Sequence, residues 1–225
     1  MSQGRRRSPL PEPYYGRDGI RIFHARCEDV LPHVDPAEVG LLLTDPPYGI
    51  DLKYGGIGDT TKVNARVAGD DEPFDPAPLL RYPRVVMFGA NHYAQRLPHS
   101  FGWLVWDKVC TNDVGSVLSD GELAWTNVSD RLRIFRHMWN GGYRASERGY
   151  SVHPTQKPTA LMRWIIDRWT APGDLVLDPY MGSGPIAQAC HELGRRYIGC
   201  EIVEDYCRVA VDRLRQQSLD FGGAA

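Results

Sequence analysis

The chain has 225 residues and a formal net charge of −2, and its sequence pI is about 6.4. This length is enough for one large α/β domain with its own core. No apolar run approaches the ~20 residues that a membrane-spanning helix needs. The charge argues against a uniformly basic nucleic-acid-binding domain. Five cysteines without a C-x-x-C pair argue against a disulfide framework or a zinc site, and they favour a reducing cytoplasm.

The N-terminal stretch holds three consecutive arginines, Arg5 to Arg7, and prolines follow instead of an apolar core. A secretory signal needs that apolar core. We therefore expect residues 1–17 to form a flexible arm.

The elements expected from periodicity and turn residues alternate along the chain. Strands are expected at residues 20–24, 41–44, 84–88, 102–106, 122–126, 174–178 and 195–201. Helices are expected at residues 27–31, around Leu79, and at 91–97, 159–169, 185–193 and 206–215. Residues 51–72 contain four glycines and no periodicity, which predicts a mobile loop. Residues 127–149 look irregular, aromatic and basic. Strands that alternate with helices predict a parallel sheet.

The most informative stretch is an apolar run, residues 41–44, that ends in Asp45-Pro46-Pro47-Tyr48. The strand must end there because proline cannot donate to a sheet ladder. Asp45 and Tyr48 then lie just beyond the carboxyl end of a strand, where open α/β sheets bind ligands. A carboxylate beside a ring on a stiff turn suits a flat base with an exocyclic amino group. The alternative is a plain proline turn with an N-capping Asp.

A second motif, Gly182-Ser183-Gly184-Pro185-Ile186-Ala187, fits G-x-G-x-x-[G/A] between a strand and a helix. Glu201 ends the following strand, where a carboxylate accepts hydrogen bonds from ribose hydroxyls. Both features predict a nucleoside-bearing cofactor, with NAD as one candidate and a structural glycine turn as the alternative. Asp178, at the tip of its strand, could accept a hydrogen bond from an amino group of that cofactor, or it could cap the next turn.

Basic residues are concentrated between residues 131 and 163, against the single acid Glu147. This asymmetry predicts either a phosphate-binding face or a solvated arginine-rich surface. The basic residues are Arg131, Arg133, Arg136, Arg144, Arg148, Lys157 and Arg163.

With these pieces in place, the chain resembles the S-adenosylmethionine-dependent amino-group DNA methyltransferases of the permuted (β) group, the N-4/N-6 DNA methylases. Its compact form is like the orphan methyltransferases of phages and prophages. Three blocks carry the resemblance in that group's order: Asp45-Pro46-Pro47-Tyr48, then His153-Pro154-Thr155-Gln156-Lys157-Pro158, then Asp178-Pro179-Tyr180-Met181-Gly182-Ser183-Gly184 with Glu201 after it. The likeness is good over residues 20–52 and 150–214, looser over 88–125, and hardly visible over 127–149.

The resemblance implies a Rossmann-like α/β fold with a mainly parallel, seven-stranded sheet and helices on both faces. It implies one catalytic domain over residues 1–225, with a small inserted target-recognition region at 107–150. Double-stranded DNA is the expected partner, a homodimer is a further possibility that the group offers, and the cytoplasm is the expected location.

The resemblance also implies roles for individual residues. Asp45, with the Pro46 carbonyl, would hold the amino nitrogen of the base toward the sulfonium methyl group, and Tyr48 would stack on a base swung out of the duplex. The implied catalytic residues are Asp45, Pro46, Pro47 and Tyr48. The implied S-adenosylmethionine contacts are Lys157, Asp178, Tyr180, Gly182, Ser183, Gly184 and Glu201, with a surface lysine as the alternative for Lys157. The implied DNA contacts are Arg131, Arg133, Arg136, Arg144 and Arg148.

An Asp at the first motif position favours N6 of adenine as the target, with N4 of cytosine as the alternative. An NAD-dependent oxidoreductase and a non-catalytic DNA-binding protein are alternatives of other classes. Two departures from the family pattern bear on the cofactor. Pro185-Ile186 stands where the family usually has Thr-Thr, and Ala25-Arg26 stands where it often has Gly-Asp. The acid that helps to hold the adenine ring is then missing, and its role falls to Cys27, to Glu28 or to neither.

Overall fold

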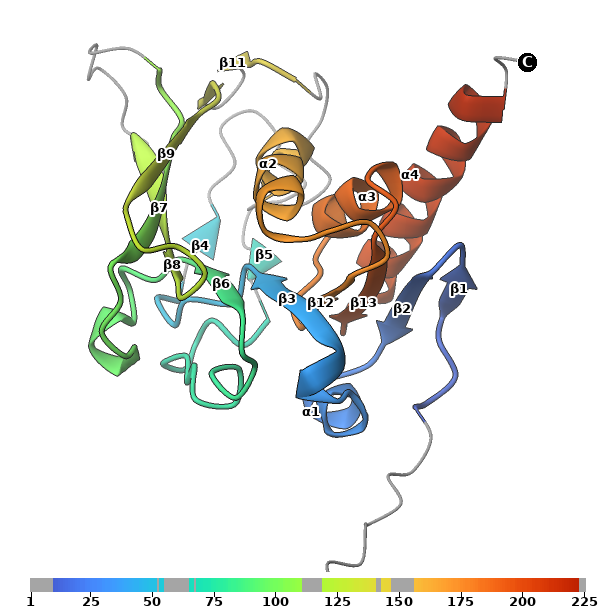
Figure 1. Cartoon of the computed structure of the whole chain (residues 1–225), viewed down its shortest axis with the longest axis horizontal. Coiled ribbons are helices and arrows are strands. Elements are labelled where there is room, and N and C mark those ends of the chain that lie inside the picture. Colours follow the sequence, from blue (N-terminus) through green and yellow to red (C-terminus); the bar gives the residue numbers. More distant parts are fainter. Residues whose placement is uncertain are drawn as a thin grey trace, which may run out of the picture.

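The computed structural model describes residues 10–51, 53–54, 65–66, 68–110, 119–140, 143–146 and 156–222. A mixed sheet runs through the molecule with nine strands in the order β1-β2-β13-β12-β3-β6-β8-β7-β9 (Figure 1). In chain order these strands are β1 (Tyr15–Arg17), β2 (Ile20–His24), β3 (Val39–Thr44), β6 (Val85–Phe88), β7 (Gly102–Asp107), β8 (Gly121–Thr126), β9 (Arg133–Arg136), β12 (Leu175–Asp178) and β13 (Arg196–Glu201). Two small strand pairs lie apart from it, β4 (Lys53–Tyr54) with β5 (Ala65–Arg66), and β10 (Trp139–Asn140) with β11 (Tyr143–Arg144).

Five neighbouring strands form the parallel part of the sheet: β2, β13, β12, β3 and β6. β8 pairs antiparallel with both β6 and β7, and β9 runs parallel to β7. The α/β, Rossmann-like class expected from the sequence is confirmed. The sheet has two strands more than the expected seven, one at each edge.

The first additional strand, β1, lies within the stretch expected to be a flexible arm. It pairs antiparallel with β2 through a two-residue turn, Asp18-Gly19, in which both residues have positive φ, 51° and 79°. Asp-Gly is the preferred sequence for this tight hairpin turn because the turn requires positive φ at both central positions. The turn therefore converts the last residues of the expected arm into an edge strand.

The second additional strand, β9, lies where irregular structure was expected. Its side chains alternate between half-buried (Arg133, Phe135) and exposed (Ile134, Arg136), which is the pattern of an edge strand. Phe135 packs on Trp164, with ring centroids 5.3 Å apart. Within the region 107–150, expected to be an inserted target-recognition region, β8 lies between β6 and β7, and β9 forms one edge of the main sheet. Its role in target recognition stays a prediction.

The sheet is covered on both faces (Figure 1). Three helices, α2 (Thr159–Trp169), α3 (Pro185–Glu192) and α4 (Glu204–Gly222), lie on one face, and the short α1 (Cys27–Val30) lies on the other with 3-10 turns. Successive strand residues point to opposite faces. Leu41 and Leu43 accordingly join the core under α2 and α3, and Leu42 joins the core on the other side. This double burial explains why the β3 sequence is apolar at consecutive positions.

Two of the expected helices are not formed. Leu79 lies in a turn in which its N–H donates to the Pro76 carbonyl. The segment 91–97 holds only a 3-10 turn at Ala94–Arg96. Tyr93, just before that turn, is buried, and its hydroxyl donates to the Phe88 carbonyl at 2.5 Å, which anchors the segment in a non-helical course.

Most of the loop expected to be mobile, residues 51–72, lies outside the described residues, as do Arg148 and residues 153–155. Within the described part of the chain, no helix combines the length and apolar character needed to cross a membrane.

Candidate active site

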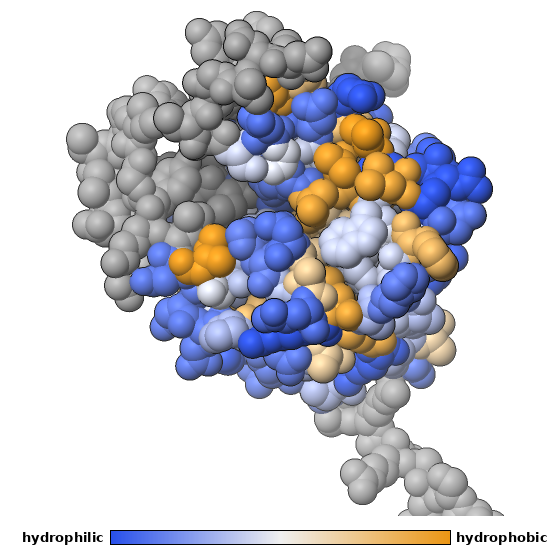
Figure 2. Space-filling model, turned by 90° about the vertical axis from the view of Figure 1, so that its left-hand side faces the viewer, coloured by the Kyte–Doolittle hydropathy of each residue, from blue (hydrophilic) through white to orange (hydrophobic). Residues whose placement is uncertain are grey.

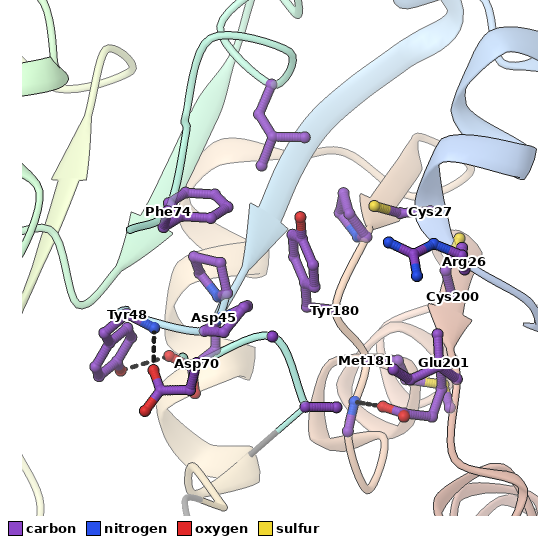
Figure 3. A pocket seen from close by; sticks show the side chains of 18 of the residues that line it. Arg26, Cys27, Asp45, Tyr48, Asp70, Phe74, Tyr180, Met181, Cys200 and Glu201 are labelled. Atoms are coloured by element: carbon purple, nitrogen blue, oxygen red, sulfur yellow. Dashed lines mark hydrogen bonds between the residues drawn. The ribbon is translucent and has the colours of Figure 1, made fainter. Parts of the chain in front are cut away.

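A cavity of about 830 Å³ lies at the carboxyl ends of β2, β3, β12 and β13. Because these strands are parallel, their carboxyl ends meet at one edge of the sheet, which is where open α/β sheets bind ligands. Asp45 and Tyr48 line one end of the cavity and Glu201 lines the other, with Tyr180 between them (Figure 3). Gly182, whose N–H donates to Glu201, also lines the cavity. The two motifs identified from sequence therefore share one site.

We call the Asp45 side of this cavity the acceptor end. Hydrogen bonds to side-chain and backbone groups hold its Asp-Pro-Pro-Tyr corner in place. The Tyr48 hydroxyl donates to Asp45 Oδ1 at 2.6 Å. The backbone N–H of Tyr48 donates to Asp70 Oδ1 at 2.8 Å (Figure 3). The N–H of Gly49 donates to the same oxygen at 2.9 Å. Asp70 was not identified from sequence, although it is buried and fixes the turn that carries Tyr48.

The Tyr48 ring is packed against two further residues. It stacks on His92 with centroids 5.1 Å apart and planes 13° apart. It also lies so close to Gly89 that a Cβ at that position would overlap the ring, and Gly89 has a φ of +68°. Burial, followed by the neighbouring Asp45 carboxylate, raises the pKa of the Tyr48 phenol well above its usual value of 10. The phenol therefore stays protonated and can donate to Asp45.

Lys157 lies at the acceptor end and not beside the glycine loop. Its Nζ contacts Asp45 Oδ2 at 2.5 Å, Glu122 Oε2 at 2.9 Å and the Tyr48 hydroxyl at 3.1 Å. Its side chain is only 3% exposed, so the surface-lysine alternative was wrong. Two carboxylates surround the buried ammonium group and pair with it, and the expected contact of Lys157 with the cofactor stays a prediction. Burial opposes that charge, but the two carboxylates raise the pKa of Lys157 above its usual value.

Asp45 is a stronger proton acceptor than an ordinary aspartate. Burial raises its pKa, Lys157 opposes this, and the Glu122 carboxylate adds to the rise. Glu122, in β8, was not identified from sequence because nothing in a strand residue reveals its partner. Burial would raise the pKa of Glu122 as well, but Lys157 and Lys108 lower it below the usual value.

At the other end of the cavity, which we call the cofactor end, Glu201 binds backbone amides. Its two carboxylate oxygens accept from Gly182 N at 2.9 Å and from Val203 N at 2.8 Å. Burial raises the pKa of Glu201 above its usual value, although these N–H groups oppose the rise. Gly182 and Gly184 have positive φ, 55° and 78°. A Cβ on Gly184 would lie 2.6 Å from the Cβ of Ala210 in α4, so this position requires glycine.

Asp178 lies behind the cavity wall and does not line the cavity. It is fully buried, and its carboxylate accepts from the Thr44 hydroxyl at 2.8 Å and the Tyr197 hydroxyl at 3.0 Å. It thereby links the end of β12 to Thr44, at the end of β3, and to Tyr197 in β13. The turn-capping alternative fits in part, since Tyr180 N also reaches Asp178 Oδ1 at 3.3 Å. Burial raises the pKa of Asp178 to about 7.

The remaining residues expected at the cofactor end have mixed positions. Tyr180 and Ser183 line the cavity, whereas Gly184 faces α4. The Ser183 side chain is buried, and within the described part of the chain its hydroxyl has no hydrogen-bond partner. A buried polar atom of this kind needs a partner. The hydroxyl therefore fits a ligand that supplies hydrogen-bonding groups.

The segment after β2 also lines the cavity at this end, through Ala25 to Glu28 (Figure 3). Arg26 is exposed, and its Nε lies 3.5 Å from Glu28 Oε2. Burial raises the pKa of the Cys27 thiol to about 11, so it is an unreactive wall residue.

Of the arginines expected to contact DNA, Arg133 and Arg136 lie in β9, Arg131 lies just before it and Arg144 lies in β11, whereas Arg148 lies outside the described residues. Several of those described already have partners. Arg131 pairs with Asp130 at 3.0 Å, and Arg136 pairs with Asp107 at 3.4 Å. The Arg144 guanidinium lies 4.3 Å from the centroid of the Trp139 ring. Figure 2 views the molecule from the β9 side and shows apolar and hydrophilic surface intermixed. The described part of this edge is therefore not a uniformly basic face.

Comparison with known proteins agrees with this geometry. The family model described as DNA methylase matches residues 129–212. YubD of Escherichia coli (strain K12) is 28% identical over 91% of this chain and 95% of its own length. The type II methyltransferase M2.DpnII of Streptococcus pneumoniae is 23% identical over 93% of this chain and 94% of its own length.

Among solved structures, the complex of M1.HpyAVI with SAM superposes with a TM-score of 0.52 at 26% identity. The superposition covers 86% of this chain and 99% of that protein. The family match, the near full-length relatives and this structure agree with the two motifs in one cavity. The chain is therefore similar to DNA methyltransferases of the N-4/N-6 group, and the family model matches it over residues 129–212.

Proposed function

We propose that this protein transfers a methyl group from S-adenosylmethionine to N6 of adenine in double-stranded DNA. The observation that carries the proposal is the shared cavity, with the Asp45 carboxylate at one end and the Gly182 loop with Glu201 at the other. An amino-group acceptor and a nucleoside-bearing donor need to meet in one space, and this cavity joins the residue types that suit each.

The cofactor end fits S-adenosylmethionine, the ligand of the related M1.HpyAVI structure. When bound, it supplies an electrophilic methyl group on a sulfonium sulfur. Glu201 would accept from the ribose hydroxyls, and the Ser183 hydroxyl would bind a polar group of the cofactor. Tyr180 and Met181 would pack against its apolar surface. Asp178 would act indirectly by holding the strand ends in place.

The acceptor end fits an exocyclic amino group. Such a nitrogen is a poor nucleophile because its lone pair is delocalised into the ring. Asp45 and the Pro46 carbonyl would accept its two N–H bonds and hold the lone pair toward the methyl group. Each Asp45 oxygen keeps a lone pair after binding Tyr48 or Lys157, since a carboxylate oxygen accepts more than one hydrogen bond. Asp45 would take the proton as the new bond forms.

Tyr48 would stack on the target base. A base inside the duplex cannot present its amino group to a cavity, so it must swing out of the stack. His92 supports the Tyr48 ring by stacking, and we propose that the target base stacks on the opposite ring face. Arg133, Arg136 and the β10–β11 hairpin would contact the DNA backbone or bases beside the cavity.

The preference for adenine over cytosine rests on Asp at position 45. Expression in a host free of DNA methylation, followed by mass spectrometry of its nucleosides, decides between the two bases. We expect N6-methyladenine. If N4-methylcytosine is the only modified base, the assignment of adenine as the target is wrong, while the proposed methyl transfer in this cavity still holds.

An NAD-dependent oxidoreductase remains the alternative that the glycine loop and Glu201 motivate. It gives no role to Asp45, Lys157 and Tyr48. Calorimetric titration with both cofactors separates the two functions. We expect binding of S-adenosylmethionine and no heat with NAD, and tight binding of NAD instead would overturn the proposal.

A further inference from the structure

A connected set of charged groups extends from the acceptor end of the cavity into the sheet. Lys157 Nζ lies between Asp45 Oδ2, at 2.5 Å, and Glu122 Oε2, at 2.9 Å. The other oxygen of Glu122 binds Lys108 Nζ at 3.0 Å. Two carboxylates and two ammonium groups therefore alternate in the order Asp45, Lys157, Glu122, Lys108.

These groups come from distant parts of the chain. Asp45 follows β3, Lys157 precedes α2, Glu122 lies in β8, and Lys108 follows β7. Glu122 is only 24% exposed, and Lys157 is 3% exposed. Charges this far from water are costly unless they are paired. Each of these charged groups therefore depends on its neighbour in the series to compensate its charge.

Glu122 weakens the stabilisation that the Lys157 ammonium group gives to the charged form of Asp45. A buried ammonium group with one carboxylate partner would form a tight pair and would make Asp45 a poor proton acceptor. Here the ammonium group is shared between two carboxylates, so Asp45 receives only part of its stabilisation. The negative charge of Glu122, which binds the same Lys157 ammonium group, also favours protonation of Asp45.

We propose that Glu122 is a positioning residue, which acts through Lys157 to hold the Asp45 carboxylate in place and to keep it basic enough to accept the amino proton. This inference deepens the proposed methyl transfer and rests on it. In that step the nitrogen–carbon bond forms while the sulfur–carbon bond breaks, the sulfur keeps the electron pair, and the amino proton passes to Asp45. Glu122 does not touch the substrate.

The other titratable groups that face Asp45 do not replace Glu122. Tyr48 and Tyr93 are phenols whose pKa values burial raises, so both stay neutral. Asp178, whose pKa the Asp45 carboxylate helps to raise, lies in its own hydrogen-bond cluster with Thr44 and Tyr197. Asp70 binds the backbone N–H groups of the corner and not the Asp45 carboxylate. Among the acids in the described part of the chain, Glu122 is thus the carboxylate that shares an ammonium group with Asp45.

The test compares Glu122→Gln, which removes the charge and keeps the shape, with Glu38→Gln, an exposed acid just before β3, as the matched control. We expect kcat to fall about tenfold in Glu122→Gln and the acidic limb of its pH–rate profile to move about one unit to lower pH. The KM for S-adenosylmethionine and its calorimetric affinity should stay near those of the parent. The control should match the parent in every respect.

A second variant keeps the test decisive if Glu122→Gln does not fold. Lys108→Met removes a positive charge next to Glu122, so it should move the acidic limb in the opposite direction, to higher pH. An acidic limb unchanged in these variants, with kcat unchanged in Glu122→Gln, would overturn the inference. A parent protein without methyl transfer would instead overturn the proposed function, so the two failures are distinguishable.

Discussion

The two ends of the cavity are built from different chemical groups of the protein. At the acceptor end, side chains from separate segments bind one another: Asp45, Tyr48, Lys157 and Glu122. At the cofactor end, one carboxylate, Glu201, binds backbone N–H groups, including that of Gly182 in the glycine loop. The first arrangement depends on charge balance, and the second depends on backbone shape. Substitutions at the two ends should therefore damage different steps of the reaction.

The largest effect is expected at the acceptor end. Asp45→Ala should lower kcat by about 10²- to 10⁴-fold, because it removes the group that orients the amino nitrogen and takes its proton. The affinity for S-adenosylmethionine should stay nearly intact, since Asp45 lies away from Glu201 (Figure 3). Single-turnover kinetics and calorimetry measure the two quantities. A variant as active as the parent would remove Asp45 from the mechanism.

The opposite pattern is expected for Glu201→Ala. Loss of a charged hydrogen-bond acceptor should weaken S-adenosylmethionine binding by about 10- to 100-fold, with a smaller change in kcat at saturating cofactor. In the parent protein, affinity should fall as pH drops through the pKa of Glu201, which burial raises above its usual value, because protonation removes the acceptor. Calorimetric titrations at several pH values measure this. An equal loss of kcat and affinity would mean that the two ends are not separable.

Gly89→Ala tests the packing of the acceptor end. The new methyl group would overlap the Tyr48 ring, and a residue with positive φ is strained by about 1–3 kcal/mol. Gly173→Ala is the matched control, because Gly173 has a φ of +85° and a Cβ added there would have nothing within 4 Å. Both variants should unfold at a lower temperature, and only Gly89→Ala should also lose kcat. Equal kcat in the two would show that the Tyr48 position is not critical.

Asp178 lies behind both ends and gives a smaller effect, on stability. Burial raises its pKa to about 7 from the usual 3.8, so the folded state binds a proton more tightly than the unfolded state. Its contribution to the free energy of unfolding is therefore complete below about pH 4 and is lost as pH rises through about 7. Asp178→Asn should remove this pH dependence. Urea unfolding of both proteins between pH 4 and 8 measures it, and identical slopes with pH would contradict the assignment.

The smallest effect is expected outside the cavity. Arg136 is exposed and pairs with Asp107, so Arg136→Ala should weaken DNA binding modestly and change the logarithmic salt dependence by at most about one. Binding isotherms at several salt concentrations measure the slope. A large loss of affinity that does not depend on salt would point to base recognition by Arg136.

The difference between the two ends also explains what could be predicted from the sequence. The glycine loop and the Asp-Pro-Pro-Tyr corner are local motifs, and the strand that precedes each of them places both at the same sheet edge. The glycines and prolines that form these turns are visible in the sequence itself. Both were therefore found, and so was the α/β class of the fold.

Contacts between distant residues could not be predicted in this way. Glu122 and Asp70 bind the acceptor end from β8 and from the far end of a long loop, and a single sequence does not show which side chains meet. Lys157 was identified, but its ion pair with Asp45 was not, because its neighbours in the sequence precede the cofactor strand. Asp178 was placed in the cavity because a strand tip does not reveal which hydroxyl groups surround it.

Other differences had a signal that could have been used. Asp18-Gly19 is a strong hairpin turn, and it predicts the edge strand β1 that the expected flexible arm contains. The alternation Arg133-Ile134-Phe135-Arg136 is typical of an edge strand, and β9 has this pattern. In both cases the composition of the surrounding residues, rich in proline or arginine, outweighed a short local pattern.

The central claim is that one cavity joins a methyl donor to an exocyclic amino group held by Asp45. The most direct measurement supplies the purified protein with DNA and S-adenosylmethionine that carries a deuterated methyl group, and identifies the labelled base by mass spectrometry. We predict label on the amino nitrogen of adenine with the parent protein and none with Asp45→Ala. Label on a ring carbon, or equal labelling by the parent and the variant, would contradict the claim.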